Sequence, residues 1–366
     1  MKSDLLKQLC EFAAISGHED NLISFIVSYL KKSTDDIHVD KLGNVTATFR
    51  GSSEKAASLA FFAHLDELGL IVKTIEDNGF LRVERVGGVP ERCLVSQQVN
   101  VHSLDDSKSY PAVVGTVSHH ITPDDKKYVV AKTSELYLDL GLSSRQEVWD
   151  WGIEVGSMVT YANNYLEMND VIVSKALDDR VGVYALLQLA SQLAQKQHEA
   201  TIYLIFSVQE EFNIRAATPT FNRLLPDAAI CLDITPACDT PETQGRYNVR
   251  LNAGPALTYM NFHGRGTLGG LLPNPKLNSF IREIAQENGI ALQNEVVIGV
   301  ITEDAFTQHC GTEGIAMAHI SLPLRYTHTP REMVAKADLE DTVTLLLALA
   351  LAFNSKIDLS RGSKPE

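Results

Sequence analysis

The chain has 366 residues, 45% of them hydrophobic and 21% charged, which is the composition of a globular protein rather than of a disordered or fibrous one. Its formal net charge of −14 disfavours binding to nucleic acid or to an anionic membrane surface through bulk electrostatics. The five cysteines are scattered and contain no Cys-x-x-Cys pair, which argues against a disulfide framework and a thiolate zinc site. No apolar run reaches the length of a membrane span, and the first residues lack the apolar core of a signal peptide, so we expect a cytoplasmic protein.

The first part of the chain predicts two helices followed by a buried strand. Apolar side chains recur at helical spacing in residues 5–12 and again in residues 16–30. Residues 58–63 form an apolar run typical of a buried strand, and the run ends in His64 and Asp66. A side chain that can bind a metal therefore stands where this strand ends.

The middle of the chain has a different pattern of apolar and polar residues. Between residues 69 and 165, short alternating segments are joined by turn signals such as Asp77-Asn78-Gly79, which indicates β-hairpins. From residue 171 onward, strands and helices alternate again. We therefore expect two domains: a discontinuous one formed by residues 1–68 and 166–366, and a small inserted β-barrel formed by residues 69–165.

Acidic residues and a histidine follow further apolar runs in the second half of the chain. They are Asp178-Asp179, Glu210-Glu211, Asp233 and His328. Because open α/β sheets place their chemistry at the carboxyl ends of the strands, we expect these side chains to meet the His64 side chain there. Each of them alone has a plain interpretation, such as a surface pair, a helix cap or a loop histidine. Together they favour a metal site.

Nitrogen and oxygen ligands of this kind suit Zn²⁺, Co²⁺ or Mn²⁺, and one carboxylate can bridge two such ions. Two ions lower the pKa of a bound water and polarise a carbonyl, and a further carboxylate must then accept the proton of the water. Glu210 fits this part, because it stands beside Glu211 and strand neighbours point to opposite faces. The chemistry predicted is hydrolysis.

These motifs resemble those of the M42 metallopeptidases, the group of glutamyl aminopeptidase, tetrahedral aminopeptidase and FrvX-like proteins. The matching segments occur in family order along nearly the whole chain, and they are residues 63–69, 176–183, 208–211, 230–233 and 323–332. The resemblance implies a doubly wound α/β catalytic domain of the zinc-exopeptidase type, interrupted by a PDZ-like β-barrel that drives assembly. It further implies a peptide substrate and a homo-oligomer, with the tetrahedral dodecamer of the family as one candidate.

The resemblance also implies a role for each residue of the predicted site. It assigns one metal ion to His64, Asp178 and Asp233, the other ion to Asp178, Glu211 and His328, catalysis to Glu210 as general base, and support of His64 to Asp66. The cofactor implied is a pair of divalent ions, zinc in the first place, with cobalt and manganese as alternatives.

Three segments depart from the family pattern, and one of them has Asn252-Ala253-Gly254-Pro255 where the family usually has Gly-Lys-Gly-Pro. The usual Val-Gly-Leu-Arg-Gly-Ala after the two glutamates is here residues 212–217, without either glycine, and the usual Gly-Thr-Asp-Ala is here residues 302–305, with Glu303 in place of the threonine. We expect reduced backbone freedom beside the base and an added negative charge near the substrate cleft.

Two alternatives to the aminopeptidase remain open. The same site could deacylate a small non-peptide amide, or the chain could be a decayed homologue that only assembles. Glycoside cleavage is disfavoured, because carboxylates that bind metals are poorly placed as a paired acid and nucleophile.

Overall fold

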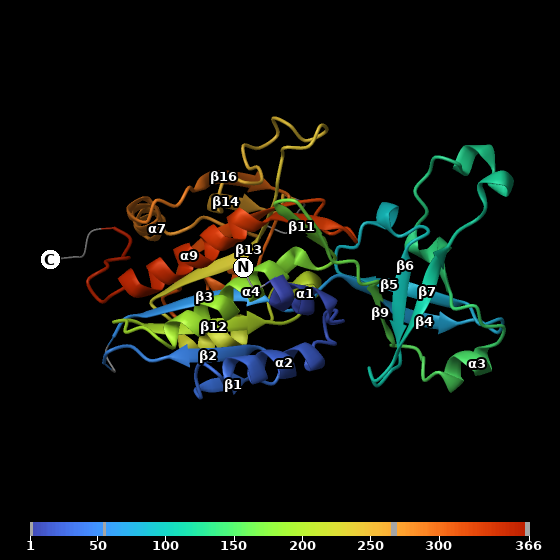
Figure 1. Cartoon of the computed structure of the whole chain (residues 1–366), viewed down its shortest axis with the longest axis horizontal. Helices are drawn as coiled ribbons and strands as arrows, with labels where there is room; N and C mark the ends of the chain where they lie inside the picture. The colour runs from blue at the N-terminus through green and yellow to red at the C-terminus, as the bar shows by residue number, and fades with distance from the viewer. Residues whose placement is uncertain (1–2, 54–55, 265–268, 363–366) are drawn as a thin grey trace.

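The computed structural model describes residues 3–53, 56–264 and 269–362, which form a large α/β body and a smaller β-barrel beside it (Figure 1). The α/β body is built on one twisted sheet. Along the sheet the strands follow one another as β1 (Ile37–Val39), β2 (Val45–Phe49), β12 (Thr201–Ser207), β3 (Ser58–His64), β13 (Ala228–Pro236), β17 (Ala316–Arg325), β18 (Glu332–Ala335), β11 (Val171–Ser174) and β10 (Leu166–Met168). Strand β14 (Ala256–Phe262) pairs with β17, β15 (Gly270–Leu271) and β16 (Gln293–Ile298).

The four central strands β12, β3, β13 and β17 run parallel. Successive residues of β3 belong to the hydrophobic cores on opposite faces of the sheet. Leu59 and Phe61 pack on one face, and Ala60 and Phe62 pack on the other. A strand that is buried on both faces reads as a continuous apolar run, as residues 58–63 do.

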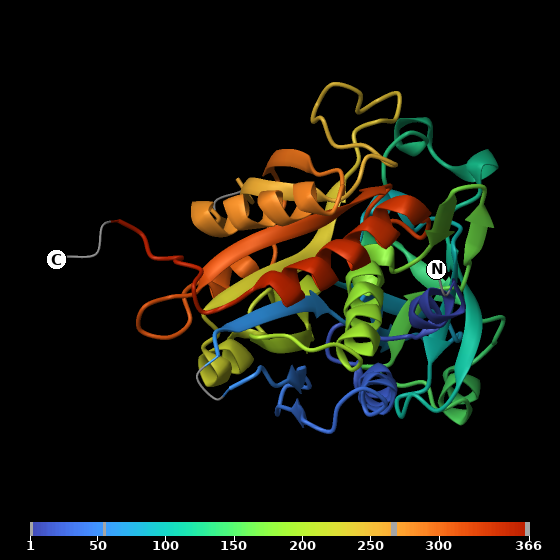
Figure 2. The same cartoon turned by 60° about the vertical axis from the view of Figure 1, so that its left-hand side comes forward.

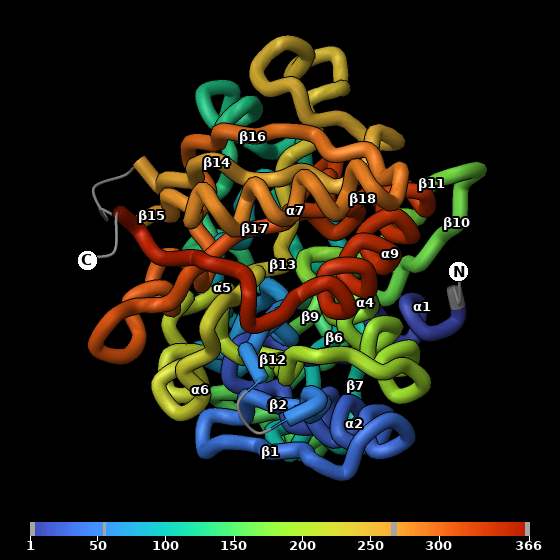
Figure 3. Tube along the Cα trace, turned by 90° about the vertical axis from the view of Figure 1, so that its left-hand side faces the viewer, coloured from blue at the N-terminus to red at the C-terminus, as the bar shows by residue number. Residues whose placement is uncertain are grey.

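Helices cover both faces of this sheet (Figure 3). On one face lie α1 (Ser3–Glu11), α2 (Asp20–Leu30), α4 (Leu177–Leu193) and α9 (Lys336–Ala352), together with α7 (Pro275–Glu287). On the other lies α6 (Thr218–Leu224), which contacts α8 (Asp304–Thr307), while the short α5 (Glu210–Asn213) follows the end of β12. In Figure 2 the red helix α9 packs beside the yellow-green α4. Of the described helices, none is long and apolar enough to cross a membrane.

The inserted segment closes into a barrel with its own apolar core. Around the barrel the strands follow one another as β4 (Gly69–Ile75), β5 (Leu81–Val86), β8 (Tyr137–Asp139), β7 (Ser109–Gly115), β6 (Gln98–His102) and β9 (Met158–Tyr161). Its helical segments are α3 (Arg145–Asp150) and the 3₁₀ turns η1 (Glu91–Cys93), η2 (His119–Ile121), η3 (Asp124–Lys126) and η4 (Thr133–Glu135). The structure thus confirms the doubly wound α/β fold and contains a closed six-stranded barrel.

One loop of the barrel approaches the end of the central sheet. At Gly88 a Cβ atom would lie 3.1 Å from Nδ1 of His328, so the two loops approach closely and a larger residue there would displace the His328 ring. The loop that carries η1 therefore forms one side of the region where the parallel strands end.

Candidate metal centre

The predicted ligands come from five separate elements and meet at the carboxyl end of the sheet. His64 is the last residue of β3, Asp178 lies at the start of α4, Glu211 in α5, Asp233 in β13, and His328 between β17 and β18. They form two groups whose ligand atoms lie within 4.8 Å of one another, namely His64 with Asp178 and Asp233, and Asp178 with Glu211 and His328. Asp178 belongs to both groups.

The carboxylate of Asp178 is oriented as a bridge. Its Oδ1 lies 3.2 Å from Nε2 of His64, and its Oδ2 lies 3.3 Å from Nε2 of His328. Two ligand atoms on one tetrahedral zinc ion are about 3.3 Å apart, because each stands roughly 2.0 Å from the metal. Each oxygen of Asp178 is therefore spaced from one histidine as two ligands of a common ion would be.

Backbone carbonyls orient both histidines. Nδ1 of His64 lies 3.1 Å from the carbonyl oxygen of Asp66, and Nδ1 of His328 lies 3.3 Å from that of Gly88. A carbonyl oxygen only accepts, so these contacts place the proton of a neutral ring on Nδ1 and leave the lone pair of Nε2 facing the centre. This is the tautomer that a metal ligand needs.

Asp66 has a wider role in the structure than support of His64. Its carboxylate accepts hydrogen bonds from the backbone N–H groups of Glu210 and Glu211, at 2.9 and 3.1 Å, and from the hydroxyl of Ser16. Its Oδ1 stands 3.5 Å from Nδ1 of His64. A single buried side chain thus fixes the start of α5 and stands beside a predicted ligand.

The electrostatics of the centre favour a cation. Burial raises the pKa of Glu211 to about 8 and that of Asp233 to about 6. Burial also opposes the charged form of His328, but the negative charge of Glu211 and the hydrogen bond to Asp178 outweigh it and raise the His328 pKa to about 10. Oε1 of Glu211 is buried and has no hydrogen-bond partner. Divalent ions would compensate these carboxylates and take up that orphaned oxygen.

The side chains of Glu210 and Glu211 point in different directions, but not for the reason predicted. Strand β12 ends at Ser207, and Gln209 has a left-handed conformation with φ of 58°, so the two glutamates lie in the first turn of α5 rather than on a strand. Neighbours on a helix point about 100° apart, since a turn takes 3.6 residues. Glu210 is buried, and its Oε2 stands 4.0 Å from Nε2 of His64.

The prediction that Glu303 adds a negative charge near the substrate cleft is wrong. Thr302 lines the cavity at the centre, but the side chain of Glu303 turns inward, is 2% exposed, and contacts the Ser207 hydroxyl and the Ala217 amide. Nor is there a need for glycine at the two positions where the family has it. Asn213 and Ala216 do not have positive φ, whereas Ile214 does, at 48°.

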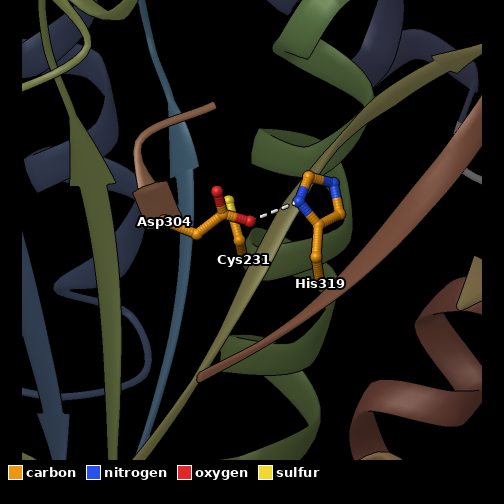
Figure 4. Close-up of side chains that lie close together, drawn as sticks. All are labelled: Cys231, Asp304 and His319. Atoms are coloured by element: carbon orange, nitrogen blue, oxygen red, sulfur yellow. Dashed lines mark hydrogen bonds and ion pairs between the residues drawn. The ribbon is translucent and has the colours of Figure 1, made fainter. Parts of the chain in front are cut away.

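A third cluster of possible ligands lies deeper in the sheet (Figure 4). Cys231 of β13 and His319 of β17 are partners in the parallel register, and Asp304 of α8 covers them. Nδ1 of His319 lies 2.6 Å from Oδ2 of Asp304, which is a hydrogen-bond distance and is shorter than the about 3.3 Å between two ligands of one tetrahedral ion. Sequence reasoning did not detect this cluster, because Cys231 and His319 lie inside apolar runs and Asp304 lies in a different segment of the chain.

A cavity of about 830 Å³ opens onto the metal centre. Polar groups of the centre, Asp178, Glu210 and Asp233 among them, form its floor. Its walls come from both parts of the molecule and include Arg92 of the barrel and Ile301 of the α/β body. The centre is therefore accessible to a substrate through a cleft between the sheet end and the barrel loop.

The fold places a cluster of possible metal ligands at an open cleft, and comparisons with known proteins identify the class of the protein. The family model described as M42 glutamyl aminopeptidase matches residues 43–345, so the chain belongs to that family and is a hydrolase of the aminopeptidase class. The protein SgcX of Escherichia coli (strain K12) is 39% identical over 348 residues, which cover 95% of this chain and 92% of SgcX.

Two solved structures resemble the whole chain. An aminopeptidase from the archaeon Desulfurococcus kamchatkensis superposes with a TM-score of 0.90 at 34% identity, covering 97% of this chain and 96% of the other. The TET1 peptidase of Pyrococcus horikoshii, which can assemble into a tetrahedron or a large octahedral shell, gives a TM-score of 0.84 at 27% identity, with 96% and 99% covered.

Proposed function

We propose that the chain is a dinuclear metal-dependent aminopeptidase that hydrolyses the N-terminal residue from peptides, with Glu210 as general base. One observation carries the proposal more than any other. The two oxygens of Asp178 face two different histidines at 3.2 and 3.3 Å, and a second carboxylate stands beside each pair as a third possible ligand. This supports one ion held by His64, Asp178 and Asp233 and a second held by Asp178, Glu211 and His328.

The donor set fits the ions proposed. Imidazole nitrogens and carboxylate oxygens suit zinc, with cobalt and manganese as alternatives. The orphaned Oε1 of Glu211 is also the kind of buried atom that a cation would satisfy. When bound, two divalent ions supply an acidified water and polarise the scissile carbonyl.

Glu210 would transfer the proton. Its carboxyl lines the cavity, stands beside His64, and has a pKa that burial raises well above its usual range. A base with a raised pKa accepts a proton more readily and can return it to the leaving amine. The backbone N–H groups of Glu210 and Glu211 donate hydrogen bonds to Asp66, and these two bonds would hold the Glu210 carboxyl in a fixed position.

The family to which the chain belongs favours the N-terminus of a peptide as the group recognised. A non-peptide amide would use the same catalytic groups, and no observation favours it. A decayed site is disfavoured, because all five ligand positions and Glu210 hold side chains suited to their roles.

The test is Glu210→Gln, with the exposed Glu313→Gln as matched control. We expect Glu210→Gln to lower kcat on aminoacyl chromogenic substrates by roughly 10²- to 10⁴-fold while two metal equivalents remain bound, and Glu313→Gln to change neither. Unchanged hydrolysis with metals bound would show that Glu210 is not the base. Full activity in a metal-free protein would end the metal hypothesis, and faster turnover of N-acyl sugars than of peptides would favour a deacylase.

We further propose that the barrel, residues 69–165, is an assembly domain and that the protein is a homo-oligomer, with the tetrahedral dodecamer as the first candidate. The assembly of the TET1 peptidase supports this proposal. So does a cluster of exposed apolar side chains on one barrel loop, with Ile121 76%, Tyr128 92% and Val129 66% exposed. Light scattering tests it, and a monomer at micromolar concentration would contradict it.

A further inference from the structure

The segment that carries Glu210 and Glu211 has an unfavourable backbone. In the stretch from Gln209 to Ala217, Gln209 has φ of 58° and Ile214 has φ of 48°. For a β-branched residue this conformation is an outlier that costs about 1–3 kcal/mol, and it persists only where the surroundings impose it. Something other than local preference must therefore hold this turn, which we call the glutamate turn (residues 209–217).

Side chains from distant parts of the sequence hold the start of the glutamate turn. Asp66 accepts from the first two amides of α5, and the buried Glu19 accepts from the amide of Gln209 at 3.0 Å. Asn44 accepts from the amide of Val208 at 3.1 Å, just before the turn. These partners fix the backbone beside Glu210 from one side.

The end of the glutamate turn is held mainly from α8. Oε1 of Glu303, the residue that caps α8, accepts from the Ala217 amide at 3.3 Å. One helical turn on, the ring of Phe306 lies 4.1 Å below the guanidinium of Arg215. Asn44 adds one contact, because its amide donates to the Ala216 carbonyl at 2.8 Å. Two independent contacts thus join the glutamate turn to α8.

The second oxygen of Glu303 reaches the strand that precedes the turn. Oε2 contacts the hydroxyl of Ser207 at hydrogen-bond distance, and the same hydroxyl lies 3.2 Å from the carbonyl oxygen of Ala63. A serine hydroxyl has one proton, so it can donate to only one of these acceptors. Both contacts are satisfied if Glu303 is a neutral acid that donates to Ser207, which in turn donates to Ala63. Burial favours that form, since it raises the pKa of Glu303 to about 8.

We propose that Glu303 is a positioning residue of the active site, which holds Glu210 and Glu211 in register with His64 by joining the Ala217 amide to the Ser207 hydroxyl. Ser207 is the partner of His64 in the β12–β3 register, so the two hydrogen bonds of Glu303 link the glutamate turn to the strand end that carries His64. The inference rests on the proposed function, because the turn matters for catalysis only if Glu210 and Glu211 act there. Glu303 stands where the family pattern has threonine, which is too short to make both contacts.

The experiment compares Glu303→Ala with Glu303→Gln in the full-length, metal-loaded protein. Glutamine can donate to Ser207 and accept from the Ala217 amide, whereas alanine leaves both groups unpaired. The matched control is Glu295→Ala, which removes another buried carboxylate that accepts from a serine, Ser321, but does not contact the glutamate turn. Two readouts are measured: amide hydrogen exchange of peptides that cover residues 207–217, and kcat and KM on an aminoacyl substrate.

We expect Glu303→Ala to speed exchange in residues 207–217 and to lower kcat by roughly 10- to 100-fold, since small displacements of reacting groups cost about that much. KM and the two metal equivalents should change little. Glu303→Gln should restore both readouts, and Glu295→Ala should leave both near wild type, even if its overall stability falls.

Wild-type exchange and wild-type kcat in Glu303→Ala would overturn the proposal. So would Glu303→Gln if it behaved like Glu303→Ala, because the two hydrogen bonds would then not be what holds the turn. If Glu303→Ala does not fold, Ser207→Ala removes one of the two bonds, and it must speed exchange in residues 209–217 or the proposal fails. Because exchange needs no turnover, it tests this inference even if the aminopeptidase proposal fails.

Discussion

Two clusters of histidine and carboxylate lie one above the other at the centre of the sheet, and only one has the geometry of a metal site. In the upper cluster, each oxygen of Asp178 lies 3.2 or 3.3 Å from a histidine nitrogen. In the lower cluster, Nδ1 of His319 and Oδ2 of Asp304 are 2.6 Å apart, which is a hydrogen-bond distance. The same residue types therefore have the spacing of metal ligands in one place and that of a hydrogen bond in the other.

Register and exposure explain this difference. Cys231 and Asp233 are two residues apart on β13, so they point to the same face at successive levels of the sheet. The level of Asp233 opens into the cavity, whereas the level of Cys231 is covered by α8 and lies in an apolar core. The upper level is open to the cavity, and packing closes the lower one.

The largest expected effect comes from the shared ligand of the upper cluster. Asp178→Asn keeps the size of the side chain but removes the charge that would bridge two ions. We expect it to lose metal and to lower kcat by more than roughly 100-fold, since even partners of metal ligands typically cost 10- to 100-fold. Elemental analysis and steady-state kinetics measure both effects. Two ions retained with full turnover would remove Asp178 from the bridge.

The equivalent change in the lower cluster should act on stability instead. Asp304→Asn leaves the imidazole of His319 buried without its counter-charge, and breaking a buried pair in this way costs about 3–5 kcal/mol of unfolding free energy. Chemical denaturation measures the loss, and the metal content should stay at two equivalents. Loss of one ion with unchanged stability would show that the lower cluster is a metal site after all.

The lower cluster should also make stability depend on pH. Burial opposes the charged form of His319, but Asp304 outweighs it, so the folded pKa lies above the ordinary value of 6.5. A raised folded pKa contributes stability that is fully present below about pH 6.5 and is lost as the pH rises through the folded pKa. The difference in unfolding free energy between wild type and His319→Gln should therefore shrink as the pH rises above about 6.5. A difference that stays constant would mean that His319 does not titrate in this range.

How far the sequence reveals such features depends on where each residue lies in its pattern. His64 and Asp178 could be singled out because each interrupts the pattern at the end of an apolar run, and a parallel sheet brings such ends together. The barrel could be recognised because its short alternating strands contrast with the α/β segments on either side.

Other features could not be predicted, because they depend on contacts that no local pattern encodes. Glu303 meets Ser207 across 96 residues, and its neighbours in sequence suggested a charge facing the cleft. In the sequence, His319 is a single polar residue in a buried strand. Only the strand register shows that it lies beside Cys231. The left-handed residue Gln209 likewise moved the two glutamates from a strand onto a helical turn.

The smallest expected effect separates the two clusters most cleanly. Cys231→Ala removes the only sulfur atom of the lower cluster and should cost about 1 kcal/mol, the value of one buried methylene-sized group. It should leave metal content and kcat unchanged, because the thiol is buried, burial raises its pKa well above the usual range, and only the thiolate is a good metal ligand. The measurement is the number of metal equivalents at saturating zinc in the wild type and the variant. If the wild type binds three and the variant two, a thiolate site exists in the lower cluster, and the distance between His319 and Asp304 must then widen when the ion binds.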